Sequence, residues 1–471
     1  MVLQNGITTD LTTYNMKNKY IIFFLSILIF SCEKMEYEDI DDIINPTEPT
    51  IELSRVDIDI PYTTMEYHDV KHASMDVRNK VYYRQNNTDY ILQTGGTNPN
   101  ITGKLHGSPM LLKKNDGGDW EFVRTWNDIG MGGVRNTYQI NANTFLFADA
   151  AEVPLNGTGI VREENHIYIA EVNGDNVNWT KIENDGYHHD ASFGDLNNDG
   201  LLDILSVSQG EIYYGMGGYN FDITFDKLPS RYGTVYFSNE IVDVDNDGVK
   251  EIIESAYIGS KEDVKNGFRI LKRNNEGNYE LFKKNTTSQN NSKGRDVGGT
   301  WTKSLDLNND GNQDLIILTE GCVNGTPCAG GTLETYFGDG QGNFNSNQLI
   351  DVSDLWLLTP NLLDIDFDGD NDIVFTAGSI GGDYKVSTGL RIGGGFNTGF
   401  RLDKLIYINQ GNGNFEQYSK ELIDYNDSYL NSFNPFINKD GKLSFYGSSV
   451  HNIEESSLSR IILWEITINN L

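Results

Sequence analysis

The sequence predicts an all-β protein whose main domain is a seven-bladed β-propeller. Three observations support this fold class: an acidic nine-residue loop occurs four times, a short β-rich run follows each copy, and a hairpin signature comes next. The loops start at residues 195, 243, 306 and 364, at intervals of 48, 63 and 58 residues. Four-stranded units that repeat at such spacing are typical of propeller blades.

The amino-acid composition alone argues against nucleic-acid binding and against a disordered chain. The 471 residues include 68 Asp and Glu against 36 Lys and Arg, which gives a formal net charge of −32. We expect no binding to nucleic acid, because neutralising phosphates requires a basic surface. The 25 Tyr, 22 Phe and 6 Trp can build a core and therefore argue against wholesale disorder.

The four loops share one pattern of oxygen-bearing side chains. They read DLNNDGLLD at 195–203, DVDNDGVKE at 243–251, DLNNDGNQD at 306–314 and DIDFDGDND at 364–372. Asp, Asn or Glu occupies positions 1, 3, 5 and 9, and Gly occupies position 6. A tight loop with Gly at its sharpest bend turns alternate oxygens toward one centre, which suits Ca²⁺ and its 6–8 oxygen ligands.

The expected ligands are the side chains at positions 1, 3, 5 and 9 and the main-chain carbonyl at position 7. Because protein groups fill these positions and leave little room for a substrate, we expect about four calcium ions with a structural role. The predicted ligand set is Asp195, Asn197, Asp199, Leu201, Asp203, Asp243, Asp245, Asp247, Val249, Glu251, Asp306, Asn308, Asp310, Asn312, Asp314, Asp364, Asp366, Asp368, Asp370 and Asp372.

An EF-hand is the competing explanation of these loops. It requires a Glu at position 12 and a helix on each side. Three of the four loops lack that Glu, and runs such as ILSV at 204–207 and LIIL at 315–318 are β-rich. We therefore expect each loop to join two strands.

The number of blades follows from the length and from the hairpin signatures. An apolar strand, a Gly/Asn turn and an aromatic residue recur at 212–221, 270–279, 335–344 and 406–415. The span 50–471 holds 422 residues, about 60 per blade, which predicts seven blades, with six or eight as alternatives. The last blade is short of a strand, and we expect the alternating segment 50–60 to complete it and close the ring.

These units resemble FG-GAP/VCBS repeats, the calcium-loop blades of integrin α-subunit propellers and many bacterial surface proteins. Phe193-Gly194 before the first loop matches a fragment of the motif that names the family. The resemblance covers about 187–428 and implies a calcium-stabilised propeller. The motif decays on both sides, where we expect blades without calcium.

The N-terminal region predicts export and lipid anchoring. Lys17 and Lys19 precede an apolar run at 20–30, which is too short to span a bilayer but suits a signal peptide. The run ends in LIFSC, which resembles a bacterial lipobox and implies lipidation of Cys32. We expect a signal peptide at 1–31 (true start at Met16), a lipid-anchored acidic linker at 32–49 and the propeller at 50–471. The alternative is a cleaved signal followed by an incidental cysteine.

Two further sequence features concern the cellular location: an acidic stretch beside the predicted anchor and a pair of cysteines. The acidic stretch 33–42 resembles surface-export signals of some Gram-negative lipoproteins, although a solvated tether also explains it. We expect a protein anchored in the cell outer membrane and exposed on the surface. In an oxidising compartment, Cys322 and Cys328 are expected to form a short-loop disulfide.

His188 and His189 are the main candidates for catalysis, with Arg231 and Tyr232 one blade later. Propeller polysaccharide lyases use residues of these types, and this resemblance implies a base, an acid and a group that neutralises a uronate. Neighbouring residues on a strand point to opposite faces, so at most one of the two histidines can face a site. Histidines that cap a strand or line the channel are the alternative.

The predicted function is that of a surface lipoprotein whose propeller binds a polysaccharide or a protein partner. A polysaccharide lyase and a structural adhesion module are the alternatives. The absence of a strong catalytic motif favours binding, and the histidine pair favours an enzyme. The glycine-rich segment 378–400 is an expected hairpin or insertion whose aromatic side chains either stack on sugar rings or pack within the hairpin.

Overall fold

Seven antiparallel four-stranded sheets dominate the described part of the chain. The computed structural model describes residues 49–61, 80–94, 109–126, 128–131, 134–149, 154–155, 159–160, 166–182, 188–207, 210–225, 227–229, 234–259, 267–286, 296–322, 329–352, 355–356, 359–376, 379–380, 402–420, 422, 434–452 and 458–471. The predicted signal peptide, linker and lipidation site lie outside these residues, as do most of the glycine-rich segment, Arg231, Tyr232 and Cys328.

Each sheet is one blade, numbered here in chain order. Blade 1 contains β2 (Lys80–Gln85), β3 (Thr88–Gln93), β4 (Met110–Lys114) and β5 (Trp120–Thr125); blade 2 contains β6 (Val134–Asn141), β7 (Thr144–Asp149), β10 (Ile167–Asn173) and β11 (Asn176–Ile182). Blade 3 contains β12 (Ala191–Gly194), β13 (Asp203–Ser206), β14 (Ile212–Gly215) and β15 (Phe221–Thr224).

The later blades follow the same order of strands. Blade 4 contains β16 (Thr234–Val242), β17 (Glu251–Gly259), β18 (Gly267–Arg273) and β19 (Tyr279–Thr286); blade 5 contains β20 (Asp296–Leu305), β21 (Asp314–Cys322), β22 (Ala329–Gly338) and β23 (Phe344–Asp351). Blade 6 contains β25 (Thr359–Leu363), β26 (Asp372–Thr376), β28 (Ile406–Asn409) and β29 (Phe415–Gln417). Blade 7 contains β30 (Asn434–Ile437), β31 (Leu443–Asn452), β32 (Leu458–Asn469) and β1 (Thr50–Pro61).

Three smaller elements lie between these strands. β8 (Pro154–Leu155) pairs with β9 (Gly159–Ile160), β24 (Leu355–Trp356) pairs with β27 (Ser379–Ile380), and a 3₁₀ helix, η1 (Leu402–Leu405), precedes β28. No helix among the described residues is long and apolar enough to cross a membrane.

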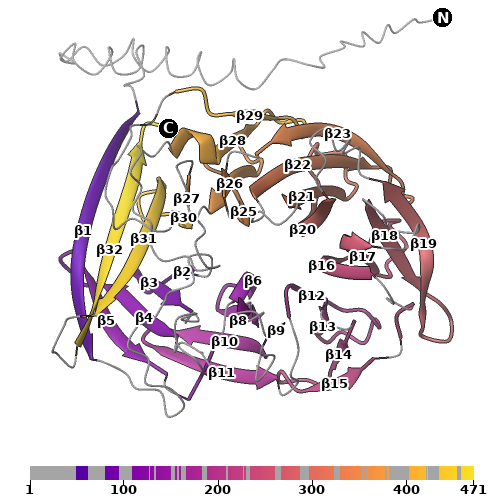
Figure 1. Cartoon of the computed structure of the whole chain (residues 1–471), viewed down its shortest axis with the longest axis horizontal. Coiled ribbons are helices and arrows are strands. Elements are labelled where there is room, and N and C mark those ends of the chain that lie inside the picture. The colour runs from indigo at the N-terminus through magenta and orange to yellow at the C-terminus, as the bar shows by residue number, and fades with distance from the viewer. Residues whose placement is uncertain are drawn as a thin grey trace, which may run out of the picture. The chain divides into compact units, whose positions relative to one another are not determined.

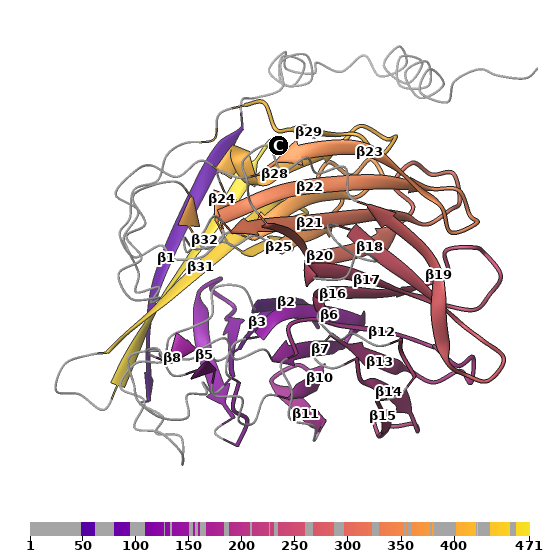
Figure 2. The same ribbon diagram turned by 45° about the vertical axis from the view of Figure 1, so that its right-hand side comes forward.

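The blades succeed one another around a common centre within residues 49–469 (Figure 1), and the turned view follows the same succession from β12–β15 through β16–β19 to β20–β23 (Figure 2). The second strands of blades 2, 3 and 6, which are β7, β13 and β26, each have a central apolar run between polar ends and are buried throughout. Strands covered by packed neighbours on both faces read as continuous apolar runs rather than as an alternating pattern. The predicted seven-bladed propeller is confirmed.

The N-terminal strand completes the last blade, as predicted. β1 pairs with β32 in an antiparallel register that runs without interruption from Thr50↔Asn469 to Pro61↔Leu458. Blade 7 then meets blade 1 through an ion pair in which Lys114 Nζ lies 2.6 Å from a Glu465 oxygen. The indole N–H of Trp120 donates to the same carboxylate at 3.1 Å. Blade 7, which contains both the first and the last described strands, is thus tied to blade 1.

Candidate metal loops

The four acidic loops join the first and second strands of blades 3 to 6, so the strand-to-strand prediction is confirmed. All four adopt one backbone conformation. Position 4 lies in the left-handed region, with φ between 56° and 60° at Asn198, Asn246, Asn309 and Phe367. The glycine at position 6 has φ between 84° and 100°, which side chains rarely tolerate. The glycine is therefore a requirement of the loop.

Two carboxylates hold each loop in this conformation. The position 1 carboxylate accepts the N–H of the position 6 glycine, at 2.8 Å in the pair Asp195–Gly200 and 3.2 Å in the pair Asp364–Gly369. The position 5 carboxylate accepts the N–H of position 7, at 2.8 Å from Asp199 to Leu201. Such side-chain-to-backbone bonds are the means by which Asp stabilises turns.

The position 9 carboxylate anchors the loop to the blade. Asp372 accepts the N–H of Ile365 at 2.9 Å and that of Asn409 on β28 at 2.8 Å. Asp203 and Asp314 make the equivalent pairs of bonds. Burial raises the pKa of Asp372 to about 6, and the two backbone hydrogen bonds only partly offset it. These carboxylates carry a desolvation cost that a cation would relieve.

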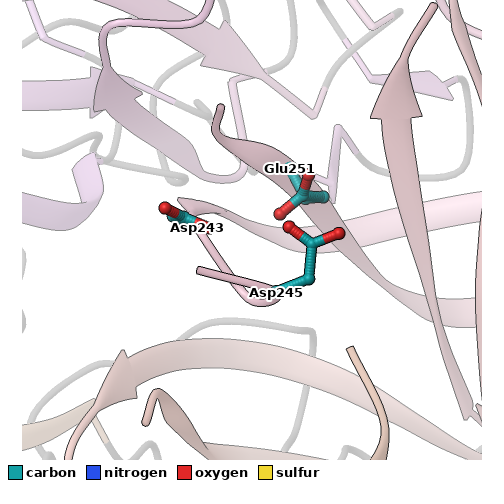
Figure 3. Close-up of side chains that lie close together, drawn as sticks. All are labelled: Asp243, Asp245 and Glu251. Atoms are coloured by element: carbon teal, nitrogen blue, oxygen red, sulfur yellow. The ribbon is translucent and has the colours of Figure 1, made fainter. Parts of the chain in front are cut away.

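Two of the loops bring three carboxylates to one point. Ligand oxygens of Asp243, Asp245 and Glu251 all lie within 4.8 Å of one another (Figure 3), and those of Asp364, Asp366 and Asp372 do the same. The other two loops have Asn at position 3. In the first loop, the Asn197 amide donates to Asp199 at 2.9 Å.

Loop 364–372 fits a bound cation. Oδ1 of Asp364 is buried and accepts no hydrogen bond from the described part of the chain. No lysine or arginine among the described residues pairs with its five carboxylates. A buried carboxylate oxygen without a donor, beside two further carboxylates, matches the hard oxygen ligands that Ca²⁺ takes.

Loop 243–251 also has a buried carboxylate oxygen without a donor among the described residues, Oδ1 of Asp245, but a lysine ammonium already lies against its carboxylates. The ammonium of Lys272, on β18, lies 2.7 Å from Asp247 and 3.1 Å from Glu251, and it also donates to Asp245. The ammonium thus contacts three of the four carboxylates of the loop. Sequence reasoning did not find Lys272, although Glu in place of Asp at position 9 distinguishes this loop from the other three.

The position 4 side chains link neighbouring loops, which the sequence pattern did not reveal. The amide of Asn198 reaches the Gly248 carbonyl at 3.4 Å, and that of Asn246 reaches Asn312 at 3.1 Å. The amide of Asn309 donates to Asp370 at 2.7 Å. The loops of blades 3 to 6 therefore form a continuous series of contacts rather than four isolated sites.

Phe367 stands where the other three loops have Asn. Its side chain is 60% exposed, and its φ is 59°, a conformation that is strained for a bulky residue. A Cβ at residue 441 would lie 3.5 Å from Cζ of Phe367, so the ring reaches the turn of blade 7. Met216 and Leu201 are further exposed apolar residues in the connections at this end of the blades.

The two candidate catalytic histidines are buried ahead of β12. Nδ1 of His188 lies 2.7 Å from Ser206 Oγ, and the His189 ring stacks on Phe237 with centroids 3.7 Å apart. Arg231 and Tyr232 lie outside the described residues, so their predicted convergence with the histidines stays a prediction. Cys322 ends β21, and its pairing with Cys328 stays a prediction for the same reason.

Asp190, next to these histidines, is a buried carboxylate whose hydrogen-bond donors are neutral, while the charge of Lys303 partly offsets the effect of burial on its pKa. It accepts hydrogen bonds from Tyr138 and, at 2.9 Å, from Asn136, both on β6, and its other oxygen accepts the N–H of Asn239 at 3.2 Å. Burial raises the pKa of Asp190 to about 6. The carboxylate joins blades 2, 3 and 4.

Comparisons with known proteins give distant structural likenesses only. No family model matches the chain, and no curated protein matches it. The chain is similar to the Dos1 propeller (9% identity, 86% of this chain and 94% of that one, TM-score 0.38). It is also similar to a Bombyx mori GH32 β-fructofuranosidase (13%, 85% and 93%, 0.34) and to an endo-1,4-β-xylanase from Bacteroides thetaiotaomicron (14%, 61% and 98%, 0.30). At these sequence identities and TM-scores, the activity of none of these proteins can be assigned to this chain.

Proposed function

We propose that this protein is a cell-surface lipoprotein, anchored in the outer membrane through Cys32, whose calcium-stabilised propeller binds a polysaccharide. The apolar run ending at Cys32 and the acidic linker support the anchor and the location. An oxidising location also supports a disulfide between Cys322 and Cys328. The acidic surface argues against nucleic acid as a partner.

The oxygen geometry of the loops supports calcium. Loops 195–203, 306–314 and 364–372 carry oxygen side chains at positions 1, 3, 5 and 9, and Oδ1 of Asp364 is buried without a donor among the described residues. When bound, Ca²⁺ would supply the positive charge that these carboxylates lack. The position 9 carboxylates would at the same time keep each loop attached to its blade through backbone hydrogen bonds.

The exposed ring of Phe367 is the observation that carries the binding proposal. Its strained backbone costs stability, and such strain persists mainly where it serves a function. An exposed aromatic face offers a flat apolar surface on which a sugar ring can stack, surrounded here by polar loops. A protein partner would need a larger apolar patch than these separate side chains provide.

The burial of the histidine pair favours binding over the lyase alternative. His188 and His189 are 0% and 1% exposed, and the base and acid of a lyase must reach the substrate's protons within hydrogen-bond distance. A polysaccharide on the loop face would contact neither ring, since both lie within the packed interior.

The test is binding of the mature protein to a panel of neutral and acidic polysaccharides, with and without Ca²⁺, together with an assay for unsaturated product. We expect binding without turnover. Phe367→Asn should weaken binding about tenfold or more while leaving the fold intact, because Asn adopts this conformation in the other three loops. Unsaturated product that disappears in His188→Ala or His189→Ala would contradict the proposal, as would unchanged binding by Phe367→Asn.

A further inference from the structure

Within loop 243–251, the ammonium of Lys272 makes contacts that a bound metal ion would make. Its ammonium contacts oxygens of Asp245, Asp247 and Glu251, which occupy positions 3, 5 and 9 of the loop. These are three of the positions at which the other loops present their predicted ligands. The ammonium of Lys272 also lies over the ring of Phe282, with Nζ 5.2 Å from its centroid, which adds a cation–π contact to the three carboxylate contacts.

No other loop has a cationic residue at the matching position. Lys272 lies beside Glu251 in the register of β17 and β18, because Ile252 pairs with Leu271. The same register places Tyr214 beside Asp203, Phe337 beside Asp314 and Ile408 beside Asp372. None of these three side chains can balance a negative charge.

The loop that faces Lys272 is also the one that has Glu instead of Asp at position 9. In the three Asp loops, the second carboxylate oxygen accepts a backbone N–H from the third strand, from Gly215, Gly338 or Asn409. In Glu251, one oxygen accepts the N–H of Val244 at 3.0 Å and the other faces Lys272. The longer side chain thus presents an oxygen to the ammonium instead of to the backbone.

We propose that the ammonium of Lys272 takes the place of a metal ion in loop 243–251, so that this loop binds no calcium. The inference rests on the proposed calcium role of the other three loops. It divides four loops of almost identical sequence into two classes. Three take their cation from solution, and one carries a cation that chelation cannot remove.

The test counts Ca²⁺ ions per chain, by titration calorimetry and native mass spectrometry, in the mature wild type, Lys272→Met and Lys283→Met. Lys283 is the matched control: its Nζ lies 5.3 Å from the same Phe282 ring, but it donates to Asn343 and to no carboxylate in the described part of the chain. We expect Lys272→Met to bind one ion more than the wild type and Lys283→Met to bind the wild-type number. In EDTA all three proteins should melt at a lower temperature than in Ca²⁺, and the drop that Ca²⁺ reverses should be largest in Lys272→Met.

The two proposals fail in different ways. A Lys272→Met protein that binds no ion above the wild-type number overturns the inference, whatever that number is. Lys272→Arg keeps a cation in the loop, so a gain of an ion in this variant would overturn it as well. A wild type that binds no ion, beside a Lys272→Met protein that binds one, would support the inference and count against calcium in the other three loops.

Discussion

Loops 243–251 and 364–372 differ in where their positive charge can come from. Each brings three carboxylates within 4.8 Å of one another, on the same backbone conformation. In the first, Lys272 pairs with the carboxylates. In the second, Ile408 occupies the matching position, and Oδ1 of Asp364 is buried without a donor.

This difference shows that the spacing of acidic residues does not by itself define a metal site. A cluster of buried carboxylates needs a countercharge, and either an ion or a side chain from another strand can provide it. The deciding residue here lies on the third strand of the blade, outside the repeated motif. The predictions below alter the countercharge, the carboxylates or the contacts between loops.

The largest effect is expected from Asp372→Ala in loop 364–372. The change removes a buried carboxylate that accepts two backbone N–H groups. We expect the free energy of unfolding to fall by about 3–5 kcal/mol, because both donors lose a charged acceptor. Chemical denaturation in excess Ca²⁺ measures the loss. The control Glu416→Ala, an exposed carboxylate on β29, should change it by less than about 0.5 kcal/mol.

Asp190 provides a third case, a buried carboxylate whose hydrogen-bond donors are neutral. Because its folded pKa of about 6 exceeds the ordinary value of 3.8, the native state keeps a proton that the unfolded chain releases near pH 4. The free energy of unfolding should therefore fall by about 2–3 kcal/mol as the pH rises from about 4 to about 6. In Asp190→Asn this decrease in the free energy of unfolding should be absent. The assignment of this pH dependence to Asp190 would be contradicted if the unfolding free energies of the wild type and of Asp190→Asn changed equally with pH in excess Ca²⁺.

Ile408→Lys tests the comparison from the other side. A lysine at this position would lie beside Asp372 as Lys272 lies beside Glu251. We expect the variant to bind one Ca²⁺ fewer, and the loss of unfolding free energy on chelation to shrink by about 1–2 kcal/mol. Ile408→Met, which changes the side chain without adding charge, should behave like the wild type. An Ile408→Lys protein with full calcium stoichiometry would break the comparison.

The smallest effect is expected at the contacts between loops. Asn309→Gly keeps the left-handed backbone and removes the 2.7 Å bond to Asp370, at a cost of about 1 kcal/mol. Asn198→Gly removes a 3.4 Å bond to a neutral carbonyl and should cost less. Thermal unfolding of the two variants measures the difference, and equal losses would argue against the contribution of these bonds.

Much of the fold could be predicted from the sequence because its signals are local. The acidic loops, the apolar second strands and the hairpin turns are each encoded within a dozen residues, and the alternation at 50–60 indicated the closing strand. The oxygen ligands of the loops could be named for the same reason.

The remaining features depend on which distant residues the register brings together. Lys272 is separated from Asp245 by 27 residues and Tyr138 from Asp190 by 52, and no periodic pattern links either pair. Phe367 was visible as an aromatic residue inside an acidic loop. Its exposure and its left-handed backbone became evident only in the folded chain.

The most direct test of the calcium account is thermal unfolding of the mature wild type in EDTA and again after Ca²⁺ is restored. The loops concentrate 15 carboxylates, and like charges at close range oppose folding unless a cation neutralises them. We predict that chelation lowers the melting temperature markedly and that Ca²⁺ restores it. Superimposable melting curves in EDTA and in Ca²⁺ would contradict the account.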